Sequence, residues 1–332
     1  MTRSNRGELE EEHLVRIVYS ALMGEDFRKY ELMSIHDEFI RESLNLFKIA
    51  WIYKKCHGNK WLDKIISDFA VKSGEEAKRL LMWFTSLNEK TVRNIAGSTK
   101  KEVIVDLGKQ NLEAIKLLVN KMINQEDNKI YPLLSIKFGD EIVKFTHEET
   151  LLLFSSIATM KLTIQGGRWS RIGILAEKAL LYTLFKLLKV PESSFILDKQ
   201  RLSNLSKVMK TERDVDGVVI NNEGKYIKIE VKLLGIGNPE ISDEAIARQP
   251  DLFITDQSTD KMEKELRKKG IFTIVLRKEK FKGTIKKLEE FFKRYNVVHD
   301  SRIIDELDEL DENKLKEYVK ECVRECVEKY KI

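Results

Sequence analysis

The segment that most constrains the fold is residues 213–234, RDVDGVVINNEGKYIKIEVKLL, because it places charged residues inside two runs of β-type residues. Elsewhere in the chain, apolar residues recur mostly at three- and four-residue spacing, which is typical of helices. In this segment they alternate with polar residues, which is typical of half-buried strands. The segment therefore predicts a β-hairpin with a five-residue turn at 221–225.

The two faces of the predicted hairpin differ in polarity, because successive side chains of a strand point to opposite faces. One face of the second strand is apolar and carries Ile227, Ile229, Val231 and Leu233. The other face carries Glu230 and Lys232. With the turn given above, Ile220 pairs with Tyr226. Asp216 then lies opposite Glu230, with Cβ atoms roughly 5 Å apart. The turn type is not fixed by the sequence, so other registers remain open.

Two carboxylates that face each other across a strand pair repel and destabilise the sheet. A divalent cation between Asp216 and Glu230 would remove this conflict, and Mg²⁺ suits such a site because it prefers oxygen ligands and keeps several waters. The ammonium of Lys232 cannot bind a metal, but it can hold a water molecule or meet a phosphate. Such a group suits the attack of water on a phosphodiester. The alternative is a solvent-facing hairpin with an ordinary acid–lysine pair, since such tripeptides are common.

A third acid, Glu177, stands on the apolar stripe of a helix predicted at 170–190. Its neighbours at helical spacing are Gly173, Leu181, Leu184 and Leu188. Burying an unpaired carboxylate is costly, so Glu177 needs a cation, a lysine or a proton. Lys232 or the metal site would supply one. The alternative is a position at the rim of the stripe, near the helix start, where the helix dipole favours an acid.

The order of the predicted elements divides the chain into a helical first part and a second part with strands. The first part has predicted helices at 14–23, 36–56, 60–72, 75–87 and 106–124, and then a hairpin around Gly139-Asp140. The second part has predicted helices at 148–162, 170–190, 239–248, 260–270, 284–298 and 312–330, a Gly-rich loop at 163–169, strands at 194–198, 251–256 and 271–276, and the hairpin described above.

A hairpin followed by alternating helices and strands predicts a mixed α/β (α+β) fold, in which helices flank a central mixed β-sheet. A large helical region precedes this sheet. We expect three parts: a helical region at 1–147, a core at 148–300 and a C-terminal helical extension at 301–332. Residues 74–96 also fit a helix-turn-helix, as do any two helices joined by a short loop.

The order of the elements, together with Asp216, the E-x-K of Glu230 and Lys232, and the inward Glu177, resembles the core of the PD-(D/E)XK nuclease superfamily. GGRWSRIGILAEKALLYTLF and TERDVDGVVI resemble segments of type II restriction endonucleases of the CfrBI-like group. The resemblance covers roughly residues 160–280 and departs from the superfamily pattern where Val215, rather than proline, precedes the Asp. No E-x-K follows Pro250-Asp251 at a useful distance, so we expect Asp251 to begin a strand.

The resemblance implies a type II restriction endonuclease that uses Mg²⁺ to hydrolyse double-stranded DNA at a short palindromic sequence. Asp216, Glu230 and the Val231 carbonyl would hold the metal. Lys232 would orient the attacking water. Glu177 would either contact the residues that hold the metal, without binding the metal itself, or bind a second metal. The resemblance also implies a homodimer, a cognate DNA methyltransferase as genetic partner, and a role in DNA recognition or dimerisation for region 1–147. The alternatives are a repair or junction nuclease of the same fold, and a nuclease-like DNA-binding regulator without catalysis.

Basic and polar residues near the site are candidate DNA contacts, since most protein–DNA hydrogen bonds go to the phosphate backbone. One group lies in and just after the Gly-rich loop, and the other lies in and just after a basic connection at 199–210. They are Arg168, Ser170, Arg171, Lys207, Lys210 and Arg213. For the residues near the Gly-rich loop, the alternative is that Ser170 caps a helix. For the residues near the basic connection, the alternative is an ordinary solvated loop.

The composition is compatible with a DNA-binding protein of the cytoplasm. The formal net charge is +5, with 34% charged residues of both signs intermixed, so a phosphate-binding surface has to be made by folding. The three cysteines, Cys56, Cys322 and Cys326, are an odd number without framework spacing. Because the first residues are polar and include no apolar run, we expect no signal peptide. No run approaches 18 apolar residues, so we expect no membrane span.

Overall fold

The computed structural model describes residues 3–125, 131–209, 215–233, 248–302 and 311–330. The chain forms two compact units. The first comprises Met1–Ser34 and Trp169–Ile332, and the second comprises Ile35–Arg168. The roles expected for the regions 1–147, 148–300 and 301–332 stay predictions.

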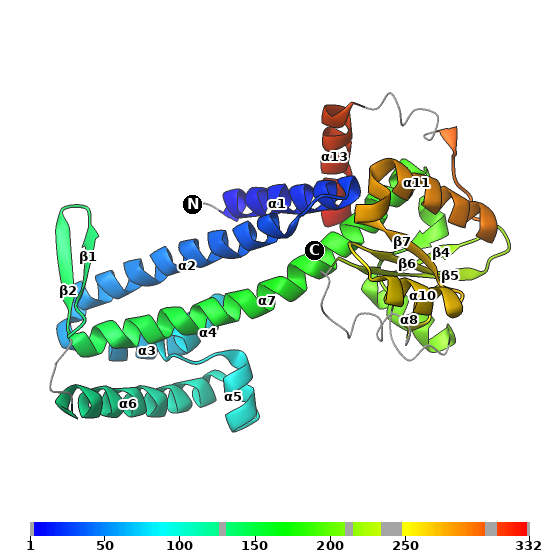
Figure 1. Cartoon of the computed structure of the whole chain (residues 1–332). Helices are drawn as coiled ribbons and strands as arrows, with labels where there is room; N and C mark the ends of the chain where they lie inside the picture. The colour runs from blue at the N-terminus through cyan, green and yellow to red at the C-terminus, as the bar shows by residue number, and fades with distance from the viewer. Residues whose placement is uncertain (1–2, 126–130, 210–214, 234–247, 303–310, 331–332) are drawn as a thin grey trace. The chain divides into compact units, whose positions relative to one another are not determined.

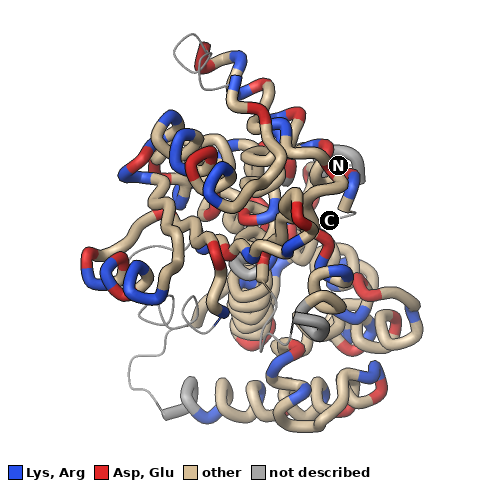
Figure 2. The backbone as a smooth tube through the Cα atoms, turned by 90° about the vertical axis from the view of Figure 1, so that its right-hand side faces the viewer, with Lys and Arg blue, Asp and Glu red and all other residues tan. Residues whose placement is uncertain are grey.

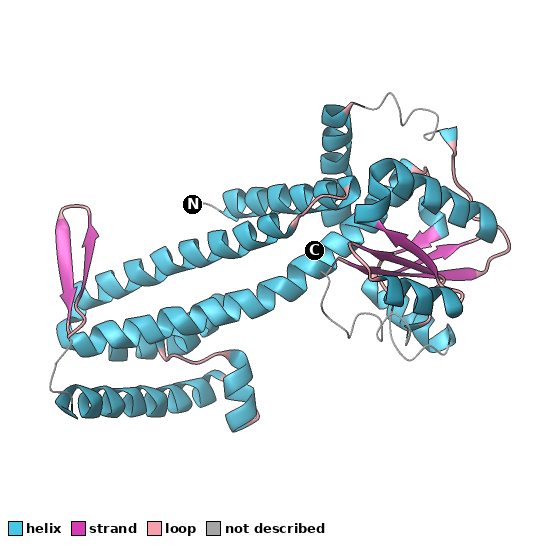
Figure 3. Ribbon diagram, viewed as in Figure 1, coloured by secondary structure: helices cyan, strands magenta, loops and turns pink. Residues whose placement is uncertain are grey.

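The second unit is mainly helical, as the spacing of its apolar residues predicts (Figure 3). Its elements include α2 (Arg28–His57, shared with the first unit), the short turn η1 (Gly58–Lys60), α3 (Trp61–Val71), α4 (Glu75–Phe84), α5 (Glu89–Ala96) and α6 (Lys101–Gln125). The Trp61 ring packs edge-on against Phe84 and Phe145, with ring centroids 6.4 and 5.5 Å away. Aromatic burial of this kind contributes much of a small core's stability.

A two-stranded hairpin in this unit confirms the prediction around Gly139-Asp140. Strand β1 (Leu134–Phe138) pairs antiparallel with β2 (Glu141–Phe145), with Phe138 opposite Glu141. Gly139 has φ +62°, a left-handed conformation that glycine adopts at little cost.

The Gly-rich loop predicted at 163–169 is wrong, because the chain there is part of one continuous helix, α7 (His147–Leu187). Gly166 and Gly167 each cost a helix roughly 1 kcal/mol relative to Ala. The helical segments on both sides are long and pack their apolar residues, and this tertiary packing outweighs that cost. Ser170 therefore lies inside a helix and does not cap one.

The first unit contains a five-stranded sheet of order β3-β4-β5-β6-β7, as Figure 1 shows. Its strands are β3 (Phe195–Ile196), β4 (Gly217–Ile220), β5 (Tyr226–Lys232), β6 (Leu252–Thr255) and β7 (Phe272–Val275). The β3–β4 and β4–β5 pairs are antiparallel, whereas β5–β6 and β6–β7 are parallel. The predicted mixed sheet is therefore confirmed.

Helices cover both faces of this sheet (Figure 1). The apolar face of β5, with Ile227, Ile229 and Val231, joins the main core together with α7, α11 (Leu276–Tyr295), α1 (Arg3–Met23) and α13 (Glu312–Tyr330). On the opposite face, smaller clusters pack the sheet against α8 (Lys199–Met209) and α10 (Asp260–Lys268). The flanked sheet predicted for this part of the chain is the observed architecture.

Two further elements differ in detail from their predictions, and one more prediction is not tested. The basic connection from 199 is the helix α8. Helix α11 begins directly after β7, and Lys280 interrupts its regular backbone with φ 54°. The helix predicted at 239–248 lies outside the described residues, apart from Arg248.

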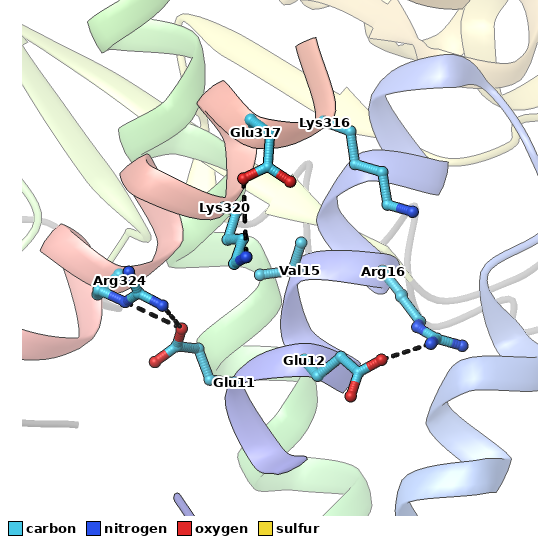
Figure 4. A pocket seen from close by; sticks show the side chains of 8 residues that line it. All are labelled: Glu11, Glu12, Val15, Arg16, Lys316, Glu317, Lys320 and Arg324. Carbon is cyan, nitrogen blue, oxygen red and sulfur yellow. Dashed lines mark hydrogen bonds and ion pairs between the residues drawn. The ribbon is translucent and has the colours of Figure 1, made fainter. Parts of the chain in front are cut away.

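The N- and C-terminal helices of the first unit pack together. Arg324 of α13 donates to Glu11 of α1 at 3.0 Å, and a groove of about 600 Å³ lies between the two helices (Figure 4). Ion pairs join the charges along this groove, among them Arg16 with Glu12 and Lys320 with Glu317. The groove therefore presents mostly compensated charge.

All three cysteines are free. Cys322 and Cys326 lie buried on α13, whereas Cys56 is exposed. Burial raises the pKa of the Cys322 thiol to about 11 and that of Cys326 to about 12. Both side chains therefore stay protonated near neutral pH and serve as small core residues.

The intermixing of charges expected from the sequence is also present in the structure. Basic and acidic residues are interspersed along the helices, as Figure 2 shows. Within the described ranges, no helix combines the length and the apolar character that crossing a membrane requires.

The two isoleucines Ile285 and Ile174 offer a matched test of the core. Ile285 of α11 is 0% exposed, whereas Ile174 of α7 is 53% exposed. Ile285→Ala should lower the free energy of unfolding by about 2–5 kcal/mol, because it removes buried methylene groups and leaves a cavity. Ile174→Ala should change it by less than about 0.5 kcal/mol. Urea unfolding followed by circular dichroism measures both, and equal losses would contradict the assigned core.

Candidate active site

The β4–β5 hairpin has the register that the sequence favours. Ile220 pairs with Tyr226, and Gly217 pairs with Ile229, so the next position along places Asp216 opposite Glu230. The Asn221 side chain holds the turn by accepting the N–H of Glu223 at 3.0 Å and that of Lys225 at 2.8 Å. A side-chain bond of this kind mimics a backbone turn and fixes the loop length, and with it the register.

Asp216 lies just before β4 and contacts the neighbouring strand. Its Oδ2 accepts the Val231 N–H at 2.9 Å and lies 3.8 Å from Lys232 Nζ. The next residue, Gly217, passes close to α7: a Cβ at this position would stand 2.8 Å from Leu197 Cδ2 and 3.1 Å from Leu181 Cδ1. Glycine therefore lets the start of β4, and Asp216 with it, approach the helix that carries Glu177.

Glu230 is completely buried, with a side chain that is 0% exposed. Its Oε1 lies 3.2 Å from Lys232 Nζ and also pairs with Arg248, whereas its buried Oε2 has no hydrogen-bond partner in the described residues. Burial, followed by the charge of Asp216, raises the pKa of Glu230 to about 7. An ionised Glu230 thus has one oxygen shared by two cations and one buried oxygen without a partner in the described part of the chain, and this second oxygen would gain from a further cation.

Lys232 stands at the centre of the group. Its Nζ lies within 4 Å of three carboxylates, those of Glu230, Asp216 and Glu177. Burial by itself lowers the pKa of the ammonium, but the three acids raise it more, so the net shift is upward. Lys232 therefore stays positively charged.

Glu177 occupies the buried position that its helical neighbours predict. It is 6% exposed, while Leu181, Leu184 and Leu188 on the same stripe are 0% exposed. Its Oε1 lies 3.8 Å from Lys232 Nζ and accepts the Leu233 N–H at 3.4 Å. Burial and the charge of Asp216 raise the pKa of Glu177, and the charge of Lys232 opposes this increase. The net result is a pKa of about 8. We call Glu177, Asp216, Glu230 and Lys232 the acid–lysine cluster.

Arg248 is a site residue that the sequence did not reveal. Its guanidinium pairs with Glu230, and its side chain is only 17% exposed. Arg248 falls at the end of a segment predicted as an ordinary helix, and no spacing rule links it to the hairpin 18 residues earlier. Only the fold brings it to the cluster.

Another buried acid, Asp256, lies one residue beyond the end of β6. Its N–H donates to the Lys232 carbonyl at 3.2 Å, and its carboxylate accepts from Arg277 Nε at 2.9 Å and from Arg28 Nη2 at 3.3 Å. These bonds connect the end of β5 to α11 and to the start of α2. The sequence does not indicate this support, because it depends on contacts between segments far apart in the chain.

The other predicted site residues are less closely tied to the cluster. Arg171 is exposed on α7. Arg168 and Ser170 lie in α7 and Lys207 lies in α8, but the structure does not describe their side chains. Lys210 and Arg213 lie outside the described residues. Asp251 precedes β6 and accepts the Lys228 N–H at 2.7 Å, which agrees with its expected place at a strand start.

The cluster is compatible with a hard divalent cation. Asp216 and Glu230 offer carboxylate oxygens, and the unpartnered Glu230 Oε2 is an unused acceptor. In the described ranges, no group of three or more His, Cys, Asp or Glu side chains is arranged so that it could hold a metal ion. Mg²⁺ commonly binds through one or two carboxylates and several waters, so the donor set fits this ion better than one that requires a full protein cage.

Comparison with known proteins now assigns the family. The family model for the CfrBI restriction endonucleases matches residues 11–263 of this chain. The chain belongs to the CfrBI restriction endonuclease family. It is 22% identical over 249 residues to the type II restriction enzyme CfrBI of Citrobacter freundii, in an alignment that covers 70% of this chain and 64% of that enzyme. The chain thus spans less than two thirds of this relative's length. No solved structure matches it.

The part of the chain that matches the CfrBI family contains the whole acid–lysine cluster and Arg248. It ends inside α10, so that β7, α11 and α13 lie beyond it. The match therefore includes both strands of the β4–β5 hairpin and the helix that carries Glu177.

The raised pKa of Glu177 predicts a pH-dependent stability. Between its ordinary value of 4.5 and about 8, the folded protein binds more protons than the unfolded chain, so the free energy of unfolding falls as pH rises. Glu177→Gln should reduce this slope and leave the part contributed by Glu230. Urea unfolding across this pH range in the presence of a chelator measures it. Glu290→Gln, at an exposed position of α11, is the control, and a wild-type slope in Glu177→Gln would contradict the assigned burial.

Proposed function

We propose that the protein is a Mg²⁺-dependent type II restriction endonuclease, which hydrolyses phosphodiester bonds in double-stranded DNA at a short palindromic sequence. The observation that carries the proposal is the buried set of three carboxylates around Lys232, on a hairpin within the range that matches the CfrBI family. A structural role alone would not favour such a set, because like charges held together in a core are costly.

Each member of the cluster has a role that follows from its contacts. Asp216 and Glu230, with the Val231 carbonyl, would hold the metal, which when bound polarises the phosphate and lowers the pKa of water. The Val231 N–H fixes the Asp216 carboxylate. The Lys232 ammonium, charged and held among three acids, would orient the attacking water and stabilise the negative charge that develops at the phosphate.

Glu177 acts on Lys232 rather than on the substrate. It lies behind the strand end, bonded to the Leu233 N–H, and helps keep the ammonium charged and in place. Water would attack phosphorus, and the 3′ oxygen would leave with a proton. The products would be a 5′-phosphate and a 3′-hydroxyl end.

The proposal includes the partners that a restriction enzyme requires. A palindromic site has two-fold symmetry, which a homodimer would match. A cognate DNA methyltransferase would protect the host DNA, in the cytoplasm where both act. Arg168, Ser170, Arg171, Lys207, Lys210 and Arg213 remain the candidate DNA contacts, and Arg171 is the one whose described side chain is exposed.

Two alternatives use the same fold. A repair or junction nuclease would recognise DNA structure rather than sequence, and a DNA-binding regulator would lack catalysis. The complete acid–lysine cluster argues against the regulator, because binding alone requires no buried carboxylates.

Incubation with plasmid DNA tests the proposal. With Mg²⁺ the wild-type protein should produce discrete fragments, and with EDTA it should produce none. Sequencing of the fragment ends would then identify the site and the position of the cut. Fragments of random length would favour a structure-specific or non-specific nuclease, and intact plasmid across Mg²⁺ concentrations and temperatures would contradict both nuclease assignments.

Substitution of the cluster separates catalysis from binding. Asp216→Ala, Glu230→Ala and Lys232→Ala should each slow cleavage by about a hundredfold or more, because each removes a group that acts in the transition state. DNA binding should largely persist. Lys228→Ala, on the same face of β5, and Glu223→Ala, in the turn, are matched controls that should cleave normally. Loss of DNA binding in all three cluster variants would identify a recognition surface instead.

A further inference from the structure

Arg248 makes an incomplete ion pair with Glu230. The contact is end-on, from Arg248 Nη1 to Glu230 Oε1, and Lys232 Nζ lies 3.2 Å from the same oxygen. Two buried groups of this pair have no hydrogen-bond partner in the described structure: Glu230 Oε2 and Arg248 Nε. One oxygen is therefore shared by two cations, while the other is unused.

A purely structural arginine–carboxylate pair would be expected to use both oxygens. The guanidinium fork matches a carboxylate in a two-bond geometry, and such pairs are the stronger ones. Leaving a buried donor and a buried acceptor without partners costs free energy. The observed contact thus neutralises Glu230 without saturating it.

The two cations on Glu230 are held unequally. Lys232 also lies 3.8 Å from both Asp216 and Glu177. In the described residues, Glu230 is the single carboxylate in ion-pair contact with Arg248. A divalent ion bound to Glu230 would repel both side chains. Arg248 would leave first, because in the described part of the chain Glu230 is its one ion-pair partner.

We propose that Arg248 is an exchangeable counter-ion of Glu230, which a divalent metal displaces and which then binds a phosphate of the DNA. The inference rests on the proposed function, which places a phosphate beside the metal. A guanidinium released there is well suited to it, since its planar donor fork matches phosphate oxygens. Metal and DNA would then bind cooperatively, because the metal frees the group that contacts the DNA.

The first test measures Mg²⁺ binding without DNA. Isothermal titration calorimetry is carried out on the full chain, at a pH above the value of about 7 to which burial raises the pKa of Glu230. Arg248→Ala and Arg248→Gln should bind Mg²⁺ about tenfold more tightly than the wild type, a change typical in size for residues just outside a ligand set. The exposed Arg267→Ala should bind as the wild type does. If the Ala variant fails to fold, the Gln variant, which keeps a planar polar group, decides the outcome.

The second test measures the phosphate contact. The affinity for a duplex carrying the mapped cleavage site is determined over a range of salt concentrations, with Ca²⁺ or with EDTA. With Ca²⁺, Arg248→Gln should reduce the slope of log K against log salt by about one, as expected for the loss of one phosphate contact. With EDTA the slopes of the two proteins should agree, because Arg248 then stays on Glu230.

The outcomes distinguish this inference from the proposed function. Equal or weaker Mg²⁺ binding by the Arg248 variants, in a protein that cleaves plasmid, would overturn the role of Arg248 alone. An unchanged salt slope with Ca²⁺ would also overturn it. Absence of Mg²⁺ binding in the wild type and in both variants would overturn the inference and the proposed function together.

Discussion

The burial of Glu230 against Lys232 is the interaction on which the site depends. A carboxylate that is 0% exposed would be too costly without a cation, and Lys232 Nζ supplies one at 3.2 Å. Lys232 in turn needs more than one acid, because burial disfavours its charged form. Asp216 and Glu177 lie close enough to supply the additional charge when they are ionised. The result is a set of interacting charges in which three of the four members are acids.

Backbone geometry brings these charges together. The turn held by Asn221 fixes the β4–β5 register, and that register places Asp216 opposite Glu230. Gly217 lets the start of β4 pass close to Leu181 of α7, the helix that carries Glu177. Around the far end of the strand, Asp256 bonds to the Lys232 carbonyl. These contacts fix both ends of the hairpin around the acid–lysine cluster, and such rigidity is what the proposed phosphodiester hydrolysis would require.

Prediction from the sequence succeeded where local rules act and failed where tertiary packing decides. The period-two pattern of β5 and the five-residue turn gave the correct register, because a one-residue slip would expose the whole apolar face. The position of Glu177 followed from the leucines on its stripe. The loop predicted at 163–169 was wrong. Two glycines destabilise a helix by less free energy than the packing of the helical segments on both sides contributes. Arg248 and Asp256 carried no signal at all, since their partners are distant in the chain.

The sequence by itself determined the mixed sheet, the hairpin and the three members of the cluster that belong to it, because strand periodicity and turn length are local properties. It also indicated that Glu177 is buried. Only the tertiary structure decided that Lys232 contacts all three acids, that Glu230 keeps an unpartnered oxygen, and that Arg248 shares this carboxylate. The physical reason is that these contacts join segments from α7, the hairpin and the approach to β6, and their distances are set by packing rather than by spacing along the chain.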